Sequence, residues 1–291
     1  MTDYLNYKGK KCVVLGGSNG MGKATVDILV DLGAEVYVLD ILPSDNERVT
    51  YIPVDCNDPD SIKTAFDQLV QFDCFFGFAG VSGVNQPTSL VLSINFLSYK
   101  YMLDELLYDK MNENGSIAIV TSNAGQYWEA HIDEFKYLTT ASREDAFKFL
   151  EINDENLVDA GAYSLSKRVL NYYSFLSAGK YAEKHIRINT VCPGFTATRL
   201  RGEFSKYLND DEEVIKSMGK GYITRDAQPE EIAKVCVFVN SDMATFVNAE
   251  EVMVDGGTRA SFLLKQKGFD FDPNNAPLYS KPVEIPENTI K

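Results

Sequence analysis

The 291-residue sequence predicts an α/β fold, a doubly wound parallel sheet with helices packed on both of its faces. Apolar segments short enough to be buried strands alternate along the chain with segments of helical periodicity. A glycine-rich turn joins the first of these strands to the first helix. The length fits one α/β domain, and the composition, 45% apolar and 24% charged, is that of an ordinary globular protein.

The order of the elements follows from this alternation. Strands are expected over residues 11–15, 35–40, 51–55, 73–79, 115–121, 186–191 and 251–254. Helices are expected over residues 21–32, 59–70, 90–111, 162–184 and 229–239. In the first helix, Met21, Ala24 and Ile28 recur at helical spacing, and Gly33 stops the helix. Strands and helices that alternate at these lengths are typical of a parallel sheet.

Two segments do not fit this alternation. Residues 126–161 hold nine acidic, three basic and six aromatic residues, and are predicted to form one or two helices that are acidic outside and apolar inside. Residues 262–291 contain four of the ten prolines and are predicted to be an extended tail without regular structure. The sequence therefore predicts a single domain over residues 1–261, with a helical insertion at 126–161, followed by a tail.

The charge argues against two classes of partner. A total of 28 basic and 42 acidic residues gives a net charge of −14 and a pI near 4.6. Nucleic acid and an anionic membrane surface would both require a basic face. The longest apolar run, residues 74–81, is too short to cross a bilayer, and the polar residues 1–11 contain no secretory signal. A cytoplasmic protein that binds neither nucleic acid nor membrane is expected.

The cysteine and histidine content argues against metal and disulfide chemistry. The five cysteines, at positions 12, 56, 74, 192 and 236, form no Cys-x-x-Cys pair and are interpreted as reduced thiols. His131 and His185 are the only histidines, which leaves no histidine cluster for zinc. No metal site is expected.

A glycine-rich loop, Gly16-Gly17-Ser18-Asn19-Gly20-Met21-Gly22, lies between the first strand and the first helix. Glycine is required where the chain turns tightly and where backbone approaches a pyrophosphate, and the helix N-terminus offers free N–H groups to the anion. The position of the cluster predicts a dinucleotide site, with a plain glycine-rich turn as the alternative. The residues expected to contact the cofactor are Gly16, Ser18, Asn19, Gly20, Met21 and Gly22.

Two carboxylates at strand ends are candidates for binding the nucleoside. Asp40 ends the second strand, where it can accept both ribose hydroxyls of an adenosine and would repel a 2′-phosphate. The loop has no basic residue before Lys23, so NAD is favoured over NADP; a solvated strand end is the alternative. Asp55, with Cys56 beside it, ends the third strand and is placed to meet the adenine. Its alternative role is to start the turn that follows.

A tyrosine and a lysine form the candidate catalytic pair. Tyr163 and Lys167 lie at i and i+4 near the start of a helix, on one face. A nearby cation lowers the pKa of a tyrosine, which could then exchange a proton with an alcohol or a carbonyl near neutral pH. Ser122 follows the fifth strand, at the sheet edge where ligands bind, and could hold the substrate oxygen. Asn95 lies early in a helix, where asparagine is unfavourable; a solvent-facing asparagine is its alternative.

Together these motifs resemble those of the classical short-chain dehydrogenase/reductase family, over about residues 9–260. The glycine loop is similar to the family pattern Thr-Gly-x-x-x-Gly-x-Gly, with Leu15 in place of threonine. The residues that fall where the family keeps its catalytic tetrad are Asn95, Ser122, Tyr163 and Lys167. A segment containing Pro193, Thr196 and Thr198 resembles the one that meets the nicotinamide, and residues 255–257 resemble the closing strand motif.

The sequence departs from the family pattern in two places. The family's Asn-Asn-Ala-Gly on the fourth strand is Gly77-Phe78-Ala79-Gly80 here, which keeps Ala79 and Gly80 as cofactor contacts but lacks the asparagines that brace the sheet. The step of 41 residues from Ser122 to Tyr163 is longer than in most members. It resembles the bacterial hydroxysteroid dehydrogenase/carbonyl reductase branch, in which an insertion changes the helices that are free for subunit contact.

The resemblance implies a Rossmann-type, NAD(H)-dependent oxidoreductase that interconverts a secondary alcohol and a ketone. Tyr163 would be the general acid/base, and Lys167 would lower the pKa of this tyrosine. Lys167 would also hold the nicotinamide ribose, and both residues would contact the cofactor. Ser122 would polarise the substrate oxygen, and Asn95 would hold a water that links Lys167 to solvent. The family's usual assembly implies a homodimer or homotetramer. Separately, we expect residues 262–291 to contribute to an interface or to the site.

The substrate class is inferred from the predicted roof of the site. The aromatic insertion and residues 199–222 would supply apolar walls suited to a bulky, rigid ligand. The predicted substrate is a neutral steroid that is oxidised or reduced at a 3- or 20-hydroxyl. The alternative is that the aromatic residues only form the core of the insertion. A sugar, polyol or small alicyclic alcohol is the second substrate hypothesis. A nucleotide-binding scaffold without turnover is the third.

Overall fold

The computed structural model describes residues 3–157, 161–207, 221–264, 278 and 281–285. Within these residues, seven parallel strands form one sheet in the order β3-β2-β1-β4-β5-β6-β7. The strands are β1 (Lys11–Leu15), β2 (Glu35–Asp40), β3 (Thr50–Pro53), β4 (Phe72–Gly77), β5 (Met111–Val120), β6 (Arg187–Pro193) and β7 (Glu251–Val254). The order reverses between β1 and β4, so the predicted doubly wound fold is confirmed, and its switch point lies there.

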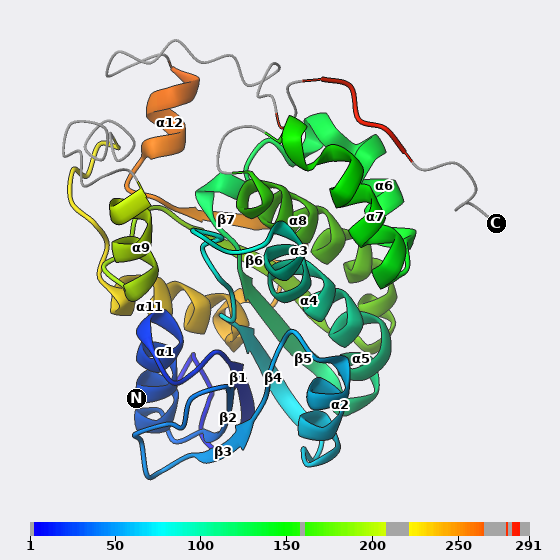
Figure 1. The fold of residues 1–291 in the computed structure, drawn as a ribbon. Helices are drawn as coiled ribbons and strands as arrows, with labels where there is room; N and C mark the ends of the chain where they lie inside the picture. The colour runs from blue at the N-terminus through cyan, green and yellow to red at the C-terminus, as the bar shows by residue number, and fades with distance from the viewer. Residues whose placement is uncertain (1–2, 158–160, 208–220, 265–277, 279–280, 286–291) are drawn as a thin grey trace.

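Helices cover both faces of this sheet, as Figure 1 shows. One face carries α1 (Gly20–Asp31) and α11 (Pro229–Asn240). The other carries α2 (Pro59–Asp67), α3 (Thr88–Leu92), α4 (Ser98–Tyr101), α5 (Leu107–Lys110) and α8 (Ala162–Tyr181). Successive strand residues point to opposite faces, so Val13 belongs to the buried cluster on the α8 side and Val14 to the cluster on the α1 side.

Local signals in the sequence account for the ends of several elements. Helix α1 ends before Gly33, which has a φ of +81° that other residues rarely adopt. Helix α2 begins after Asp58, whose side chain accepts a hydrogen bond from the Asp60 N–H at 2.9 Å, with Pro59 as its first residue.

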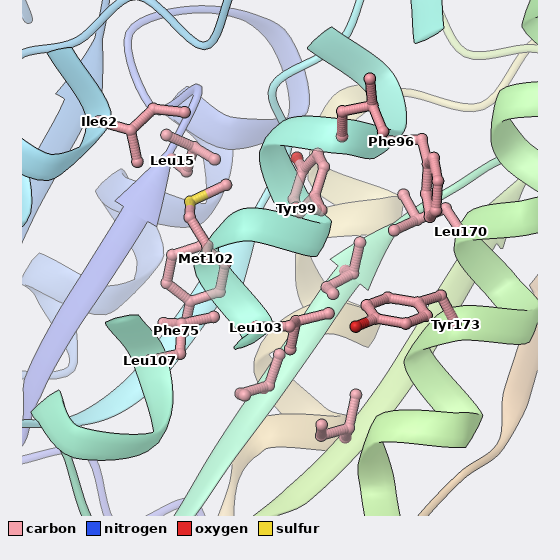
Figure 2. Close-up of a cluster of buried hydrophobic side chains, with 14 of the residues drawn as sticks. Leu15, Ile62, Phe75, Phe96, Tyr99, Met102, Leu103, Leu107, Leu170 and Tyr173 are labelled. Atoms are coloured by element: carbon pink, nitrogen blue, oxygen red, sulfur yellow. The ribbon is translucent and has the colours of Figure 1, made fainter. Parts of the chain in front are cut away.

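The predicted helix at 90–111 is one helical run from Thr88 to Lys110 that contains two π-helical segments. The π segments are Ser93–Leu97 and Met102–Leu106. The run ends directly at β5, which therefore begins at Met111 and not at the predicted residue 115. Figure 2 shows side chains of this run, among them Phe96, Tyr99 and Met102, packed in the cluster that also holds Phe75 and Leu170.

The insertion was expected to form one or two helices, and it contains two α-helices, α6 (Ile132–Thr140) and α7 (Arg143–Asn153). Its aromatic side chains Phe135 and Phe149 are fully buried in the main cluster. Trp128 packs against Tyr172 and Phe175 of α8, with ring centroids 5.8 and 5.5 Å apart. Phe135 and Phe149 are therefore insertion core, and the prediction that they wall a substrate site is wrong for these two. Trp128 is only partly buried, so a substrate wall stays a prediction for it.

The described part of the tail returns to the insertion. The tail was predicted to start at residue 262, but α12 (Thr258–Leu263) continues two residues beyond the domain boundary at 261. Leu278 is fully buried in the main cluster. Glu284 exchanges two hydrogen bonds of 3.0 Å with the Asn153 side chain at the end of α7. The other tail residues lie outside the described residues.

None of the helices in the described part of the chain has the length and the apolar character that crossing a bilayer requires.

Candidate active site

The glycine loop lies at the carboxyl edge of the sheet, between β1 and α1. Gly16 has a φ of +77° and donates its N–H to the Leu39 carbonyl at 2.7 Å. A Cβ atom on Gly22 would lie 2.0 Å from the Gly16 oxygen, so only glycine fits at this crossing. Asn19 precedes α1 in an extended conformation, and its side chain does not cap the helix. The first turn of α1 can therefore direct its N–H groups at an anion.

Asp40 is held against this loop. Its carboxylate accepts hydrogen bonds from the Ser18 N–H at 2.9 Å and from the Leu42 N–H at 3.0 Å. Lys23, the first basic residue after the loop, forms ion pairs with Asp27 at 3.2 Å and with Asp45 at 2.9 Å. The structure thus brings three carboxylates to this end of the loop and occupies its lysine with two of them.

Asp55 and Cys56 are placed differently from the glycine loop. The Asp55 carboxylate accepts a hydrogen bond of 2.8 Å from the Asn57 N–H, which is the turn-starting role considered as its alternative. Cys56 packs against the main cluster, and burial raises the pKa of its thiol to about 12. An adenine contact for these two residues stays a prediction. Met21 likewise packs against the second buried cluster.

Tyr163 and Ser122 meet at the end of β5, and both side chains are buried. Burial raises the pKa of the Tyr163 phenol, and a hydrogen bond with the Ser122 side chain acts in the opposite direction. This net direction differs from the expected lowering by Lys167, whose ammonium lies 5.8 Å from the centre of the tyrosine ring. Removal from water raises the pKa of the Tyr163 phenol more than the hydrogen bond with Ser122 lowers it.

Lys167 lies beside Tyr163 in α8 and is only 4% exposed. Burial lowers the pKa of its ammonium group to about 8. Its Nζ donates to the Val120 carbonyl at 3.4 Å, and a Cβ atom on Gly80 would lie 3.4 Å from the same Nζ. The lysine therefore lies between the ends of β4 and β5, as its proposed role beside the cofactor requires.

Asn95 is fully buried, so the solvent-facing alternative is wrong. Its side chain accepts from the Val81 N–H at 2.8 Å and donates to the Val81 carbonyl at 3.0 Å and to the Ser166 hydroxyl at 3.2 Å. Ser166 in turn donates to the Tyr163 carbonyl at 2.8 Å. Asn95 lies in the first π segment, a helix irregularity that is frequent at functional sites. Its expected role in holding a water stays a prediction.

The segment after β6 approaches the glycine loop from the other side. Pro193 is the last residue of β6, and Thr196 is buried, with its hydroxyl donating to the Gly194 carbonyl at 3.1 Å. A Cβ atom on Gly20 would lie 3.4 Å from the Thr198 methyl group. The structure therefore brings the predicted nicotinamide segment and the predicted pyrophosphate loop together.

Helix α9 (Arg199–Tyr207) covers Tyr163. The Phe204 ring lies edge-on to the Tyr163 ring, with centroids 5.1 Å apart at 73°. Ser82, after β4, donates a hydrogen bond of 2.5 Å to Glu203. Of the aromatic residues considered as substrate walls, Phe204 is thus placed at the reacting group.

Sequence reasoning missed a buried polar cluster behind the site. Asn171, one turn after Lys167, donates to the Gly125 carbonyl at 3.0 Å and to Glu251 at 3.1 Å. The Cys192 thiol donates to the same Glu251 oxygen at 3.5 Å. The cluster joins β7 to the segments that carry Ser122, Lys167 and Pro193. Only the helical spacing of Asn171 from Lys167 was visible in the sequence, because the other contacts depend on the sheet order.

The arrangement has the parts of a nicotinamide-dependent oxidoreductase. A glycine loop leads into a helix N-terminus, and a strand-end carboxylate lies beside the loop. A buried tyrosine contacts a serine and lies close to a lysine. Among the described residues, no group of three or more His, Cys, Asp or Glu side chains could hold a metal ion.

Comparisons with known proteins agree with this class. A family model described as short chain dehydrogenase matches residues 10–135, and one described as enoyl-(acyl carrier protein) reductase matches residues 153–259. Coniferyl-alcohol dehydrogenase of Pseudomonas sp. strain HR199 is 27% identical over 262 residues, which are 89% of this chain and 100% of the relative. The 3beta-hydroxysteroid dehydrogenase 2 of Eggerthella lenta is 26% identical over 272 residues, 87% of this chain and 95% of that protein.

A solved structure shows the same fold. The 3-alpha-hydroxysteroid dehydrogenase of Pseudomonas sp. B-0831, complexed with NADH, has a TM-score of 0.72 at 22% identity, and the match covers 89% of this chain and 100% of that one. The chain belongs to the classical short-chain dehydrogenase/reductase family. It is an alcohol dehydrogenase or reductase of that family, and its cofactor is a nicotinamide dinucleotide.

Proposed function

We propose that the protein is an NAD(H)-dependent hydroxysteroid dehydrogenase, which interconverts a secondary alcohol and a ketone on a neutral steroid. The observation that carries the substrate class is the contact of the Phe204 ring with the buried Tyr163. An aromatic side chain at the proton-transferring group favours a flat, apolar ligand over a sugar or polyol. The likeness over most of its length to a protein named as a 3beta-hydroxysteroid dehydrogenase adds support.

The preference for NAD over NADP rests on the acidic end of the glycine loop. Asp40 faces the loop, and Lys23 is held by Asp27 and Asp45. A 2′-phosphate would meet carboxylates here, and the lysine that could compensate its charge is already engaged. The hydroxyls of an unphosphorylated ribose can instead donate to Asp40.

The proposed proton chemistry uses four of the described residues. When bound, the cofactor supplies or accepts a hydride at its nicotinamide ring. In the reduction, the Tyr163 hydroxyl would give its proton to the substrate oxygen, and Ser122 would donate a hydrogen bond to that oxygen. The lysine ammonium would stabilise the phenolate that this step leaves, and Asn95 would hold the water through which Tyr163 recovers a proton from solvent. Burial excludes bulk water from Tyr163 and Lys167, which strengthens these interactions.

An aryl alcohol is a second candidate substrate. The protein named coniferyl-alcohol dehydrogenase matches at 27% identity over its whole length. A single aromatic ring would stack on Phe204 as a steroid would, and it would need a smaller pocket.

The test is NADH oxidation with a panel of carbonyl compounds. The panel contains 3-keto and 20-keto steroids, coniferyl aldehyde, sugars and small ketones, with NADPH in parallel. We expect steroid turnover with NADH, reduced about 100-fold or more in Tyr163→Phe because the proton donor is lost. Turnover of only small polar ketones would reject the steroid, and a preference for NADPH would reject the NAD assignment. Cofactor binding without any turnover would indicate a nucleotide-binding scaffold.

A further inference from the structure

We infer that Tyr99 is a positioning residue for the cofactor-binding segment that follows β4. This inference rests on the proposed nicotinamide site. Tyr99 follows Asn95 by one helical turn, and both side chains reach the chain at residues 79–81. The Tyr99 hydroxyl donates to the Ala79 carbonyl at 2.9 Å, while Asn95 holds both backbone groups of Val81. One helical run therefore fixes three consecutive peptide groups, from the Ala79 carbonyl to the Val81 carbonyl, at the edge of the site.

The fit between Tyr99 and β4 is close. A Cβ atom on Gly77 would lie 2.6 Å from Cε1 of the Tyr99 ring and 3.2 Å from its hydroxyl oxygen. The ring thus lies directly on the backbone of the last residue of β4, in the space that any other side chain would fill. Tyr99 is fully buried, and Figure 2 shows its ring among Leu15, Phe96 and Met102. Burial raises the pKa of its phenol, so the hydroxyl stays protonated and remains a donor.

The segment that Tyr99 holds connects the two halves of the site. A Cβ atom on Gly16 would lie 2.6 Å from the Ala79 nitrogen, so the glycine loop rests on the Phe78–Ala79 peptide group, directly before the one that Tyr99 holds. One residue further on, Gly80 faces Lys167 and Asn95, at 3.4 and 3.2 Å from the position of its Cβ atom. A small shift of Ala79 would therefore move the backbone between the pyrophosphate loop and the catalytic lysine. Without the tyrosine hydroxyl, the Ala79 carbonyl would lose a partly buried hydrogen bond.

The test compares Tyr99→Phe with a matched variant, Tyr181→Phe. Tyr181 is also fully buried, and its hydroxyl also donates to a backbone carbonyl, that of Leu103, at 2.7 Å. Both variants remove one buried hydroxyl and keep the ring, so both should lose similar stability. We expect Tyr99→Phe to raise the Kd for NADH, measured by its fluorescence, by about three- to tenfold, the range of one buried hydrogen bond. Tyr181→Phe should leave the Kd unchanged, and in turnover the KM for the cofactor should rise more than kcat falls in Tyr99→Phe.

A second variant tests whether Tyr99 acts through its contact with β4. Gly77→Ala should push the ring away from β4 and raise the Kd through the same lost contact. The double variant Gly77→Ala, Tyr99→Phe should then bind NADH no more weakly than Gly77→Ala alone, because the two changes share one interaction.

Two results would overturn the inference in a chain that binds cofactor. One is an unchanged Kd in Tyr99→Phe despite a lost stability equal to that of Tyr181→Phe. The other is an equal rise of the Kd in both tyrosine variants, which would indicate general loosening of the core. Failure of the unaltered protein to bind NADH or NADPH would overturn the cofactor site itself, and the inference with it.

Discussion

At the scale of single residues, the charge of Lys167 is set by its burial. The structure holds the pKa of this lysine at about 8, against an ordinary value of 10.5 in the unfolded chain. Below pH 8 the folded protein must keep an ammonium group out of water, and above 10.5 neither state carries the charge. The folded state therefore binds fewer protons than the unfolded state between these two values.

This difference predicts the pH dependence of stability. The contribution of Lys167 to the free energy of unfolding should rise with pH from about 8 to 10.5, by up to about 3 kcal/mol. The measurement is urea unfolding of the unaltered protein and of Lys167→Met at several pH values. The difference between their free energies of unfolding isolates the effect of Lys167, because the contributions of all other groups cancel. A difference that stays constant across this range would show that the lysine titrates as it does in solution.

The residue scale also shows where sequence reasoning ends. Gly16, Gly22, Tyr163 and Lys167 could be predicted because each lies in a local spacing that the chemistry requires. Tyr99 could not be predicted in the same way, because its partner carbonyl lies 20 residues away and meets it only once β4 and the helix pack together. The proposed positioning role of Tyr99 depends on a tertiary contact that no local sequence pattern marks.

At the scale of elements, the insertion is anchored to the helix that carries Asn95. Arg143, the first residue of α7, donates to the Ser93 hydroxyl at 2.6 Å and to the Asn57 carbonyl at 2.8 Å. Ser93 begins the π segment and itself donates to the Asn57 side chain at 2.6 Å. The cluster thus joins the insertion, the turn after β3 and the π segment.

Loss of this anchor should destabilise the protein. Arg143→Met leaves the Ser93 and Asn57 groups without their charged donor, and we expect a loss of about 1–3 kcal/mol in the free energy of unfolding. Lys148→Met is the control on the same helix, because its ion pair with Asp145 is largely exposed on the lysine side and should contribute little. Equal effects of the two variants in urea unfolding would show that the Arg143 cluster is not an anchor.

Most elements could be predicted because their periodicity is local. The pattern at 251–254 marked β7 at its observed bounds, and the two insertion helices followed from their apolar faces. The π segments and the early start of β5 could not be predicted, since apolar spacing does not distinguish a π turn from an α turn. They depend on how the run from Thr88 to Lys110 packs on the sheet.

At the scale of the whole molecule, the described residues near the C-terminus pack on the middle of the chain. Leu278 enters the main cluster, and Glu284 pairs with Asn153 at the end of α7. The insertion itself covers α8 through Trp128 and α6. The predicted homodimer or homotetramer stays a prediction, and an assembly of intact subunits would have to use surfaces other than this covered part of α8.

Leu278 should therefore contribute strongly to stability although it lies in the predicted tail. Leu278→Ala removes a fully buried side chain, and we expect a loss of about 2–5 kcal/mol, measured by chemical unfolding. Ile285→Ala, in which the side chain removed is 47% exposed, should cost less than about 1 kcal/mol. If the two variants were equally stable, Leu278 would not be part of the core in solution.

The close fit of Tyr99 on Gly77 also constrains the history of the chain. A methyl group at position 77 would overlap the Tyr99 ring and would have to displace it. In an ancestor with a side chain at 77, we therefore expect glycine to have arrived before the tyrosine. Once both were present, a side chain at 77 would again displace the ring. We therefore expect reconstructed ancestral sequences to contain Gly77 without Tyr99, and not Tyr99 without Gly77.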